Sequence, residues 1–374
     1  MLTVGVNLLW CRPGEVGGSE EYLARQLAGL AELDITDLDL TLFVLPNYPS
    51  AHRDLAGRFT MVRAPVDGRS RGLRVAVENT WLAARTREFR LQLVHHAGGT
   101  MPRGGGAPGV LTVHDLQYLA YPQFFSRIKL TWLATAVPAS VRRAAALTVP
   151  SEYVKGTVVS SFGYPADRVV VVPHGLDGVI VAAPLDEPAL RSRYGLPGRF
   201  VLYPAITHPH KNHAMLVRAF AALEGDDRLR LVLLGGAGAA DDAVAAEIAH
   251  LGLGDRVVRP GRVPDADRDG LYQLATVTAF PSLYEGFGAP VLEAMALGSP
   301  VVAANATALP EVVGTAGVLV DPFDEEAWSD TLAHLLDDEA ERARLARLGR
   351  SRARSFNATG SARALLEAYR LALA

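Results

Sequence analysis

The chain has 374 residues, 49% of them apolar, and a formal net charge of −3; this length exceeds what one hydrophobic core usually supports, so we expect two domains. Its apolar runs are shorter than the roughly 18 to 20 residues of a membrane span, and the N-terminus lacks the charged and apolar segments of a secretory signal. Together with a single cysteine, Cys11, which excludes an intramolecular disulfide and a cysteine-rich zinc site, this predicts a cytoplasmic protein.

Short apolar runs alternate with longer helical patterns in the first half of the chain, as in βαβ units with a parallel sheet. The predicted elements are, in order, strand 2–8, helix 20–32, strand 40–45, helix 71–89, strand 91–95, strand 110–113, helix 127–143, strand 146–149, a helix from the cap Ser151 to about 162, and strand 169–172. Residues 1–173 are therefore predicted to form one Rossmann-like domain.

Residues 174–198 are predicted to be a linker, because this region is rich in proline and has no long periodic run. A second alternation follows, with strands at 200–204, 229–234, 257–259, 277–280, 301–303 and 317–320 and helices at 214–223, 241–251, 268–275 and 289–297. Residues 199–355 form the second predicted domain. The helical tail ends in a helix over 356–374, which we expect to pack back on the N-terminal domain through Leu365, Leu366 and Tyr369.

The most informative segment runs from Phe280 to Val302, where a loop joins a buried strand to a helix with proline in its first turn. The backbone N–H groups of Phe287, Gly288 and Ala289 would point over the strand ends, where open α/β sheets bind ligands. A helix start in this position binds phosphate.

Two glutamates lie in this segment, Glu285 in the loop and Glu293 about two turns into the helix. Eight positions apart, they cannot be an adjacent acid/base pair, and they suit hydroxyl recognition on either side of a diphosphate. We assign Glu285 to sugar hydroxyls and Glu293 to a ribose, the alternative for Glu285 being a solvated loop acid.

These residues resemble the signature of glycosyltransferase family 4, in which two glutamates separated by seven residues bracket a nucleotide-sugar donor. The resemblance implies an α/β protein of the GT-B fold, with two Rossmann-like doubly wound domains facing across a cleft. The N-terminal domain would bind the acceptor and the second domain the donor. The implied activity is the retaining, metal-independent transfer of a hexose, with mannose or glucose as the expected sugar. The donor would be a GDP or UDP sugar, and no cofactor is expected.

Further segments are similar to other motifs of that family, spread over about 300 residues. Gly17 and Gly18 match the diglycine loop that approaches the diphosphate, and His114 matches a histidine that faces the donor sugar, with Asp115 orienting the loop or the histidine. Lys211 matches a lysine that contacts phosphate. The remaining donor-binding positions are Gly235, Arg262, Val263, Gly286, Phe287, Gly288 and Ala289.

One departure from the family concerns the arginine that often precedes the phosphate-contacting lysine by about five residues. This chain has Ile206-Thr-His-Pro-His in that neighbourhood. The second cation is therefore missing from the pattern, and His208 or His210 is the candidate to replace it.

Other classes of function fit the sequence less well. The glycines after Leu234 lack the spacing of a dinucleotide fingerprint, which disfavours an oxidoreductase. The acid pairs Asp37/Asp39 and Asp265/Asp267 are expected to be solvated turns rather than metal sites, and His208, His210 and His213 lack the helical spacing of metal ligands. A nucleotide-sugar epimerase of the same architecture and a non-catalytic nucleotide-sugar-binding protein remain as alternatives.

The acceptor is left open by the sequence: a sugar, a lipid-linked glycan or a small natural product would each fit, and nucleic acid is not an expected partner. Ten arginines against four acids lie between Arg53 and Arg103. Such a run would meet an anionic acceptor or a membrane surface, which would place the protein at the inner face of the plasma membrane. A solvated arginine-rich face is the alternative.

Overall fold

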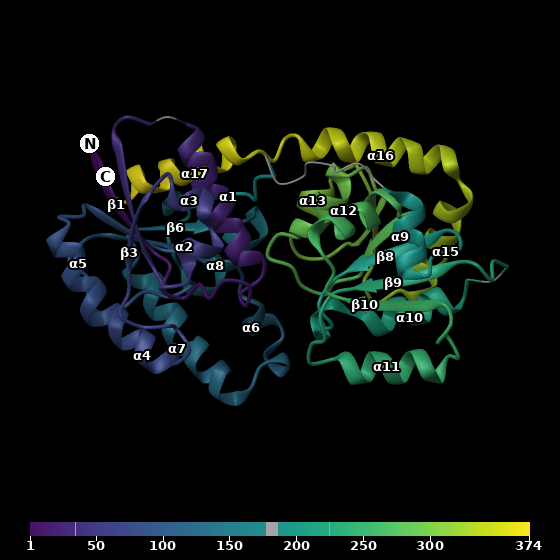
Figure 1. Cartoon of the computed structure of the whole chain (residues 1–374). Helices are drawn as coiled ribbons and strands as arrows, with labels where there is room; N and C mark the ends of the chain where they lie inside the picture. The colour runs from purple at the N-terminus through teal and green to yellow at the C-terminus, as the bar shows by residue number, and fades with distance from the viewer. Residues whose placement is uncertain (34, 177–185, 224) are drawn as a thin grey trace. The chain divides into compact units, whose positions relative to one another are not determined.

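The computed structural model describes residues 1–33, 35–176, 186–223 and 225–374. The chain forms two compact units, which are described separately: the first comprises Met1–Gly175 and Phe356–Ala374, and the second Leu176–Ser355 (Figure 1). Each unit is built on one parallel sheet.

The sheet of the first unit has seven parallel strands in the order β3-β2-β1-β4-β5-β6-β7. Its strands are β1 (Leu2–Asn7), β2 (Leu38–Val44), β3 (Thr60–Arg63), β4 (Leu93–His96), β5 (Gly109–Thr112), β6 (Ala146–Val149) and β7 (Val169–Val171). Strand β3 was not predicted, because this edge strand is short and its side chains are half-buried or exposed. The strand order reverses between β1 and β4, which defines a switch point.

Serine caps set the start of three helices of this unit. The side chains of Ser70, Ser126 and Ser151 each accept a hydrogen bond from the backbone N–H three residues on. The predicted helix over 71–89 contains a π-helical segment, η1 (Glu78–Leu82). The helices are α1 (Gly18–Glu32), α2 (Tyr48–Ala51), α3 (Arg53–Ala56), α4 (Arg71–Val77), α5 (Ala83–Glu88), α6 (Gln117–Ala120), α7 (Arg127–Arg143), α8 (Glu152–Phe162) and α17 (Ala358–Leu371), with 3-10 turns η2 (Pro122–Phe124) and η3 (Ala166–Arg168).

The last helix of the chain, α17, completes the core of the first unit. Leu365, Leu366 and Tyr369 are buried in the same cluster as the apolar residues of α1 and β1. The Tyr369 hydroxyl lies 3.0 Å from Nδ1 of His95, whose Nε2 lies 2.7 Å from the Thr112 hydroxyl. The first unit is therefore built from both ends of the chain.

The sheet of the second unit has six parallel strands in the order β10-β9-β8-β11-β12-β13. Its strands are β8 (Phe200–Pro204), β9 (Arg230–Leu234), β10 (Val257–Gly261), β11 (Val277–Phe280), β12 (Val301–Ala304) and β13 (Val318–Val320). Its helices are α9 (Glu187–Tyr194), α10 (His213–Ala221), α11 (Asp241–His250), α12 (Asp265–Leu274), α13 (Ala289–Ala296), α14 (Leu309–Val313), α15 (Glu325–Asp337) and α16 (Glu339–Ala353), with the 3-10 turn η4 (Pro209–Lys211). The switch point lies between β8 and β11.

The predicted linker over 174–198 is wrong in its last part, which contains helix α9. Asp186 caps this helix by accepting a hydrogen bond from the N–H of Ala189, and Pro188 lies in the first turn, where proline is favourable. The proline that indicated a linker thus marks a helix start. Residues 177–185 of the predicted linker lie outside the described residues.

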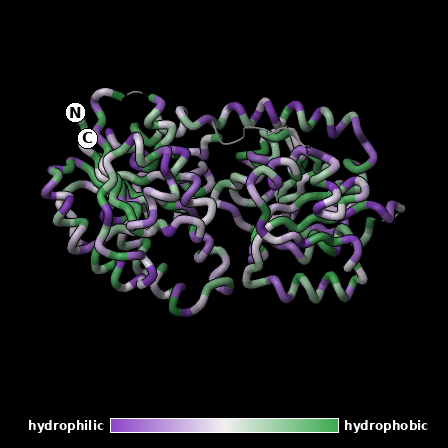
Figure 2. The backbone as a smooth tube through the Cα atoms, in the orientation of Figure 1, coloured by the Kyte–Doolittle hydropathy of each residue, from purple (hydrophilic) through white to green (hydrophobic). Residues whose placement is uncertain are grey.

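The hydropathy of the chain follows the layers of each unit. The strands at the centre of each sheet are mostly hydrophobic, whereas the outer helices alternate between hydrophobic and hydrophilic residues (Figure 2). Within the described ranges, no helix is both long enough and apolar enough to cross a bilayer.

The packing of α17 makes a testable prediction for the stability of the first unit. Leu365 is fully buried, so Leu365→Ala should destabilise this unit by about 2 to 5 kcal/mol. Hydrogen exchange of the β6 and β7 amides would measure this separately from the second unit. Leu373→Ala, at a side chain that is 43% exposed, is the control and should change stability by no more than about 0.5 kcal/mol. Equal protection in Leu365→Ala and the control would contradict the described packing.

Candidate active site

The side chains of Lys211 and Glu285 form an ion pair at the switch point of the second sheet. Lys211 lies in the loop after β8 and Glu285 in the loop after β11, and these two strands are neighbours. The Nζ atom of Lys211 donates to Oε1 of Glu285 at 2.6 Å. The side chains are 18% and 16% exposed, so the pair is mostly removed from water yet still reachable from it.

Backbone contacts hold the two loops in register. The Tyr203 hydroxyl donates to the carbonyl of Lys211 at 2.7 Å and lies 3.1 Å from the Ser282 hydroxyl. The N–H of Leu283 donates to the carbonyl of His210 at 2.7 Å. Because main-chain groups on both sides are fixed, the ion pair joins two positioned loops rather than two mobile side chains.

The electrostatics of the pair favour a charged carboxylate. Burial by itself would raise the pKa of Glu285, but the Lys211 ammonium more than offsets this and lowers it below its usual range. Burial and the Lys211 charge lower the pKa of His210 to about 4. His210 is therefore neutral at pH 7 beside Lys211, and a neutral ring can still donate one N–H to an anion.

The loop after β11 ends in a helix start of the kind that binds anions. Gly288 has φ of 101°, a conformation that L side chains rarely adopt, and an added Cβ would lie 2.6 Å from Leu309 Cδ2. Helix α13 begins at Ala289, and its N-cap residue, Gly288, has no side chain that could cap it. Its first-turn N–H groups and the helix dipole therefore favour a phosphate at this position.

The second glutamate, Glu293, is buried in α13 among apolar residues and is 8% exposed. It interacts electrostatically with Arg268 of α12. Burial lowers the pKa of the Arg268 guanidinium, but the carboxylates of Glu293, Asp269 and Asp265 outweigh this and raise it. Glu293 thus lies next to a cation that the sequence analysis did not single out.

The predicted nucleobase side follows β9, which is next to β8, and β10, which is next to β9. The N–H of Gly235 donates to the carbonyl of Gly261 at 3.0 Å. A Cβ at Gly236 would lie 3.4 Å from Nε of Arg262, so this side chain covers the glycine turn, and Val263 follows it in the chain. The structure brings Gly235, Arg262 and Val263 to the same carboxyl edge as Lys211 and Glu285.

The remaining predicted residues lie in the first unit. His114 follows β5, and its Nε2 lies 2.8 Å from the carbonyl of Ala97, so this nitrogen carries the proton. Burial lowers the pKa of His114, which leaves Nδ1 of a neutral ring as an acceptor. The Asp115 carboxylate accepts from the N–H of Gln117 at 2.9 Å and so shapes the loop.

The diglycine loop lies at the start of α1. Gly17 has φ of 71°, and the helix begins at Gly18, two residues earlier than predicted. No atom outside the neighbouring residues lies within 4 Å of a Cβ added at either position. Tyr22 of α1 packs edge-on against His114, with ring centroids 5.7 Å apart. The loop and the histidine therefore share the carboxyl edge of the first sheet.

Two residues beside the predicted site residues of the second unit, Thr307 and Arg268, were not predicted from the sequence. The Thr307 hydroxyl accepts from the N–H of Glu285 at 3.0 Å, and Thr307 has φ of 54°, uncommon for a β-branched residue. Arg268 is the neighbour of Glu293. The available signal was positional: Thr307 follows β12 and Arg268 lies in the helix after β10, both at the carboxyl edge.

The sequence predicted that Asp265 and Asp267 form a solvated turn. In the structure both residues lie in helix α12, and one of them has a structural role. Asp267 is 13% exposed on its side chain and accepts hydrogen bonds from Arg193 and the Tyr194 hydroxyl, each at 2.6 Å. It therefore ties α9 to α12, whereas Asp265 is 86% exposed. In the part of the chain that the structure describes, no three or more His, Cys, Asp or Glu side chains could together hold a metal ion.

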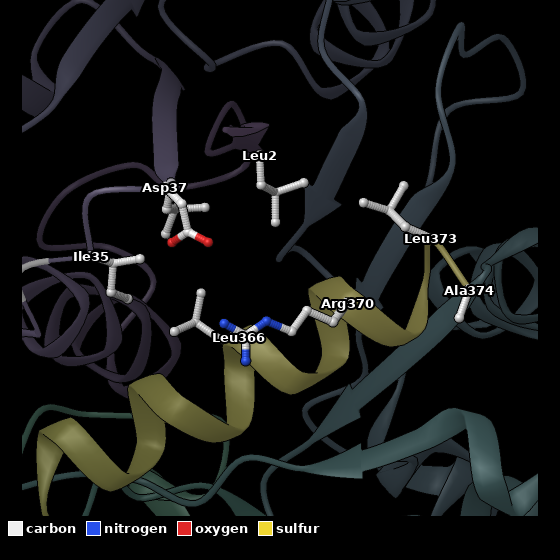
Figure 3. A pocket seen from close by; sticks show the side chains of 8 residues that line it. Leu2, Ile35, Asp37, Leu366, Arg370, Leu373 and Ala374 are labelled. Carbon is white, nitrogen blue, oxygen red and sulfur yellow. The ribbon is translucent and has the colours of Figure 1, made fainter.

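A cavity of about 420 Å³ in the first unit is separate from the predicted site residues. It is lined mainly by apolar side chains, with Asp37 and Arg370 as its charged members (Figure 3). It lies where α17 passes the amino ends of β1 and β2, which begin at Leu2 and Leu38. Ligands of open α/β sheets bind at the opposite, carboxyl edge.

Known proteins match both halves of the chain. Residues 16–178 match the model of Glycosyltransferase Family 4, and residues 188–352 that of Glycosyl transferases group 1. O-antigen chain mannosyltransferase B of Escherichia coli is 32% identical over 267 residues, 70% of each chain. A D-inositol 3-phosphate glycosyltransferase of Xylanimonas cellulosilytica is 36% identical over 224 residues, which span 57% of this chain and about half (53%) of that relative.

Solved structures resemble the whole chain in fold. Anabaena Alr3699/HepE in complex with UDP and glucose has a TM-score of 0.77 at 22% identity, covering 98% of this chain and 99% of that one. The sucrose-phosphate synthase of Thermosynechococcus elongatus also has a TM-score of 0.77 at 22% identity, covering 99% of this chain and 98% of that one. The two units and these likenesses define the GT-B class of glycosyltransferases.

The chain belongs to glycosyltransferase family 4, within the group 1 glycosyl transferases. The fold class predicted from the sequence and the glycosyltransferase activity implied by the resemblance are confirmed. The comparisons give no support to the epimerase or to the non-catalytic binding protein.

The ion pair predicts a shift in a measurable pKa. Lys211→Met removes the charge that opposes burial, so the pKa of Glu285 should rise above its usual value. Carbon-13 NMR titration of labelled glutamate carboxyls would follow this. In the native chain, the lowered pKa of Glu285 contributes to the free energy of unfolding, and this contribution is lost as the pH falls through that pKa. In the variant, the raised pKa of Glu285 should make the free energy of unfolding fall as the pH rises. Lys155→Met, at a lysine on α8, is the control, and a Glu285 pKa that is the same in both variants would contradict the pairing.

Proposed function

We propose that the chain is a retaining, metal-independent hexosyltransferase that moves mannose or glucose from a GDP or UDP sugar to an acceptor sugar, a lipid-linked glycan or a small natural product. The observation that carries this proposal is the Lys211–Glu285 pair beside the α13 helix start, at the switch point of the second sheet. The names of the relatives support the donor class: one is a mannosyltransferase, and one structural neighbour is a complex with UDP and glucose.

The roles of the second unit follow from charge and position. Lys211 neutralises the charge that builds on the leaving diphosphate, and the N–H groups from Gly286 to Ala289 bind the same group. Glu285 binds the hydroxyls of the transferred sugar. Glu293, whose charge interacts with the Arg268 guanidinium, binds the ribose, while Gly235, Arg262 and Val263 line the nucleobase side.

The first unit contributes the acceptor side and one contact to the donor. His114 is neutral and is fixed by the Ala97 carbonyl. It contacts the transferred sugar through Nδ1, the ring nitrogen that carries no proton. Asp115 keeps the loop of His114 in shape. Gly17 and Gly18 let the main chain approach the diphosphate, since neither carries a side chain.

Retention is assigned to a front-side path. The bond between the anomeric carbon and the phosphate oxygen breaks, and the acceptor oxygen bonds to the same face of that carbon. The proton of the acceptor hydroxyl passes to the leaving phosphate oxygen. Charge stabilisation by Lys211 and the helix start then performs the role that a divalent metal plays in other transferases.

The stereochemistry of the product tests the proposed reaction. With GDP-mannose or UDP-glucose and an accepted sugar, proton NMR of the early product should show the anomeric configuration of the donor. An inverted anomer would refute retention. Exchange of donor epimers in the absence of any acceptor would instead favour an isomerase.

Replacement of the lysine tests its catalytic role. Lys211→Ala should lower turnover by about 100- to 1000-fold, the scale for losing one preorganised electrostatic contact. The double variant Lys211→Met with Glu285→Gln removes both charges and so avoids an uncompensated buried carboxylate. It should stay folded by thermal melting yet remain slow, with Lys155→Ala as the fully active control. Normal turnover in the folded double variant would remove both side chains from the mechanism.

A further inference from the structure

The first turn of α7 presents an apolar side chain between two cations. Ile128 is 86% exposed, the most exposed of the large apolar side chains of the described residues. Arg127 and Lys129 flank it in the chain. Together with Thr131, Trp132 and Thr135, Arg127 and Ile128 line a shallow groove of about 420 Å³.

This groove continues onto α4. The Arg71 guanidinium of α4 lies 3.6 Å from the centre of the Trp132 ring, so the two helices are side by side. Leu73 of α4 is 54% exposed. Because α4 starts after β3 and α7 after β5, both helix starts belong to the carboxyl edge of the first sheet, where His114 also lies.

The charge of this region is of one sign. Residues 116–141 contain two basic residues, Arg127 and Lys129, and no Asp or Glu. Within the described ranges, Arg127 and Lys129 have no carboxylate at ion-pair distance, and the Lys129 ammonium instead lies 5.0 Å from the Phe125 ring centre. These two cations, which lie outside the arginine-rich run between Arg53 and Arg103, are therefore available to an anionic partner.

We propose that Arg71, Arg127, Ile128, Lys129 and Trp132, here named the α7 basic–apolar surface, dock the first unit on an anionic lipid bilayer. Lys and Arg near a membrane are attracted by anionic headgroups. An exposed aliphatic side chain gains free energy by entering the acyl boundary. Tryptophan at a membrane–water boundary keeps its ring at headgroup level. The surface supplies all three groups within two turns of α7 and the start of α4.

The alternative partner, single-stranded nucleic acid, fits these residues less well. Bases bind such proteins by stacking on open aromatic faces. One face of Trp132 is already covered by Arg71, and the most exposed group is the aliphatic Ile128, which offers no stacking surface. The observed chemistry is that of a lipid headgroup and its acyl boundary.

Vesicle co-sedimentation of the full chain, without donor or acceptor, tests the proposal. Binding should be strong to vesicles of phosphatidylcholine with phosphatidylglycerol, weak to phosphatidylcholine alone, and reduced by salt. Arg127→Gln and Lys129→Gln should each weaken binding by about five-fold, and Ile128→Ser by about ten-fold or more.

Two matched variants serve as controls. Arg142→Gln removes a cation from the other end of α7, about 22 Å along the helix axis, and Leu373→Ser removes an exposed apolar side chain that lies two residues after the end of α17. Both should bind vesicles like the native chain. Thermal melting identifies any variant that fails to fold. If Ile128→Ser does not fold, Arg127→Gln and Lys129→Gln still test the proposal, because both side chains are exposed and their replacement should not disturb folding.

Several outcomes would overturn the proposal. One is equal binding to neutral and anionic vesicles; another is no binding to either. A loss in Arg142→Gln as large as that in Arg127→Gln would indicate nonspecific charge attraction, and tight binding of an oligonucleotide in place of vesicles would indicate nucleic acid. Since no transfer is measured, failure of the proposed hexosyltransferase activity leaves this result unaffected.

Discussion

The contact between the Lys211 ammonium and the Glu285 carboxylate joins two loops whose residues are 74 positions apart in the chain. Both charges are mostly removed from water, and an unpaired charge in such a place costs several kcal/mol, on the order of 3 to 5 when one partner is lost. The pair therefore makes the position of each loop depend on the other. The helix start at Gly288, three residues after Glu285, inherits this constraint.

The strand order explains why this contact lies where a donor would bind. β8 and β11 flank the point at which the order reverses, so the loops after them diverge and leave the carboxyl edge open. The Glu285 carboxylate occupies the place of an anion beside Lys211, in the loop that leads into α13. A diphosphate that enters would compete for the same cation, which leaves the carboxylate to hydrogen-bond to the sugar. Binding of a diphosphate would thus transfer Lys211 from the Glu285 carboxylate to the phosphate in the same step.

Sequence patterns were sufficient where local physics sets the structure. Strand β11 and helix α7 were predicted with their observed bounds, because a short, mostly apolar run and a longer helical pattern mark them. Four-residue helices such as α2 were missed, since one turn has no period. Motifs singled out Lys211 and Glu285 individually, but their contact arises from strand order. Thr307 was missed because its position after β12 was the one available signal, and its left-handed backbone conformation has no mark in the sequence.

The most direct test is a crystal structure of the chain with a nucleoside diphosphate sugar. The distal phosphate should lie at hydrogen-bond distance, about 3 Å, from Lys211 Nζ and from the first N–H groups of α13, with Glu285 turned to the sugar. A diphosphate bound elsewhere, with the Lys211–Glu285 pair still intact, would show that this pair and the α13 helix start do not form the donor site.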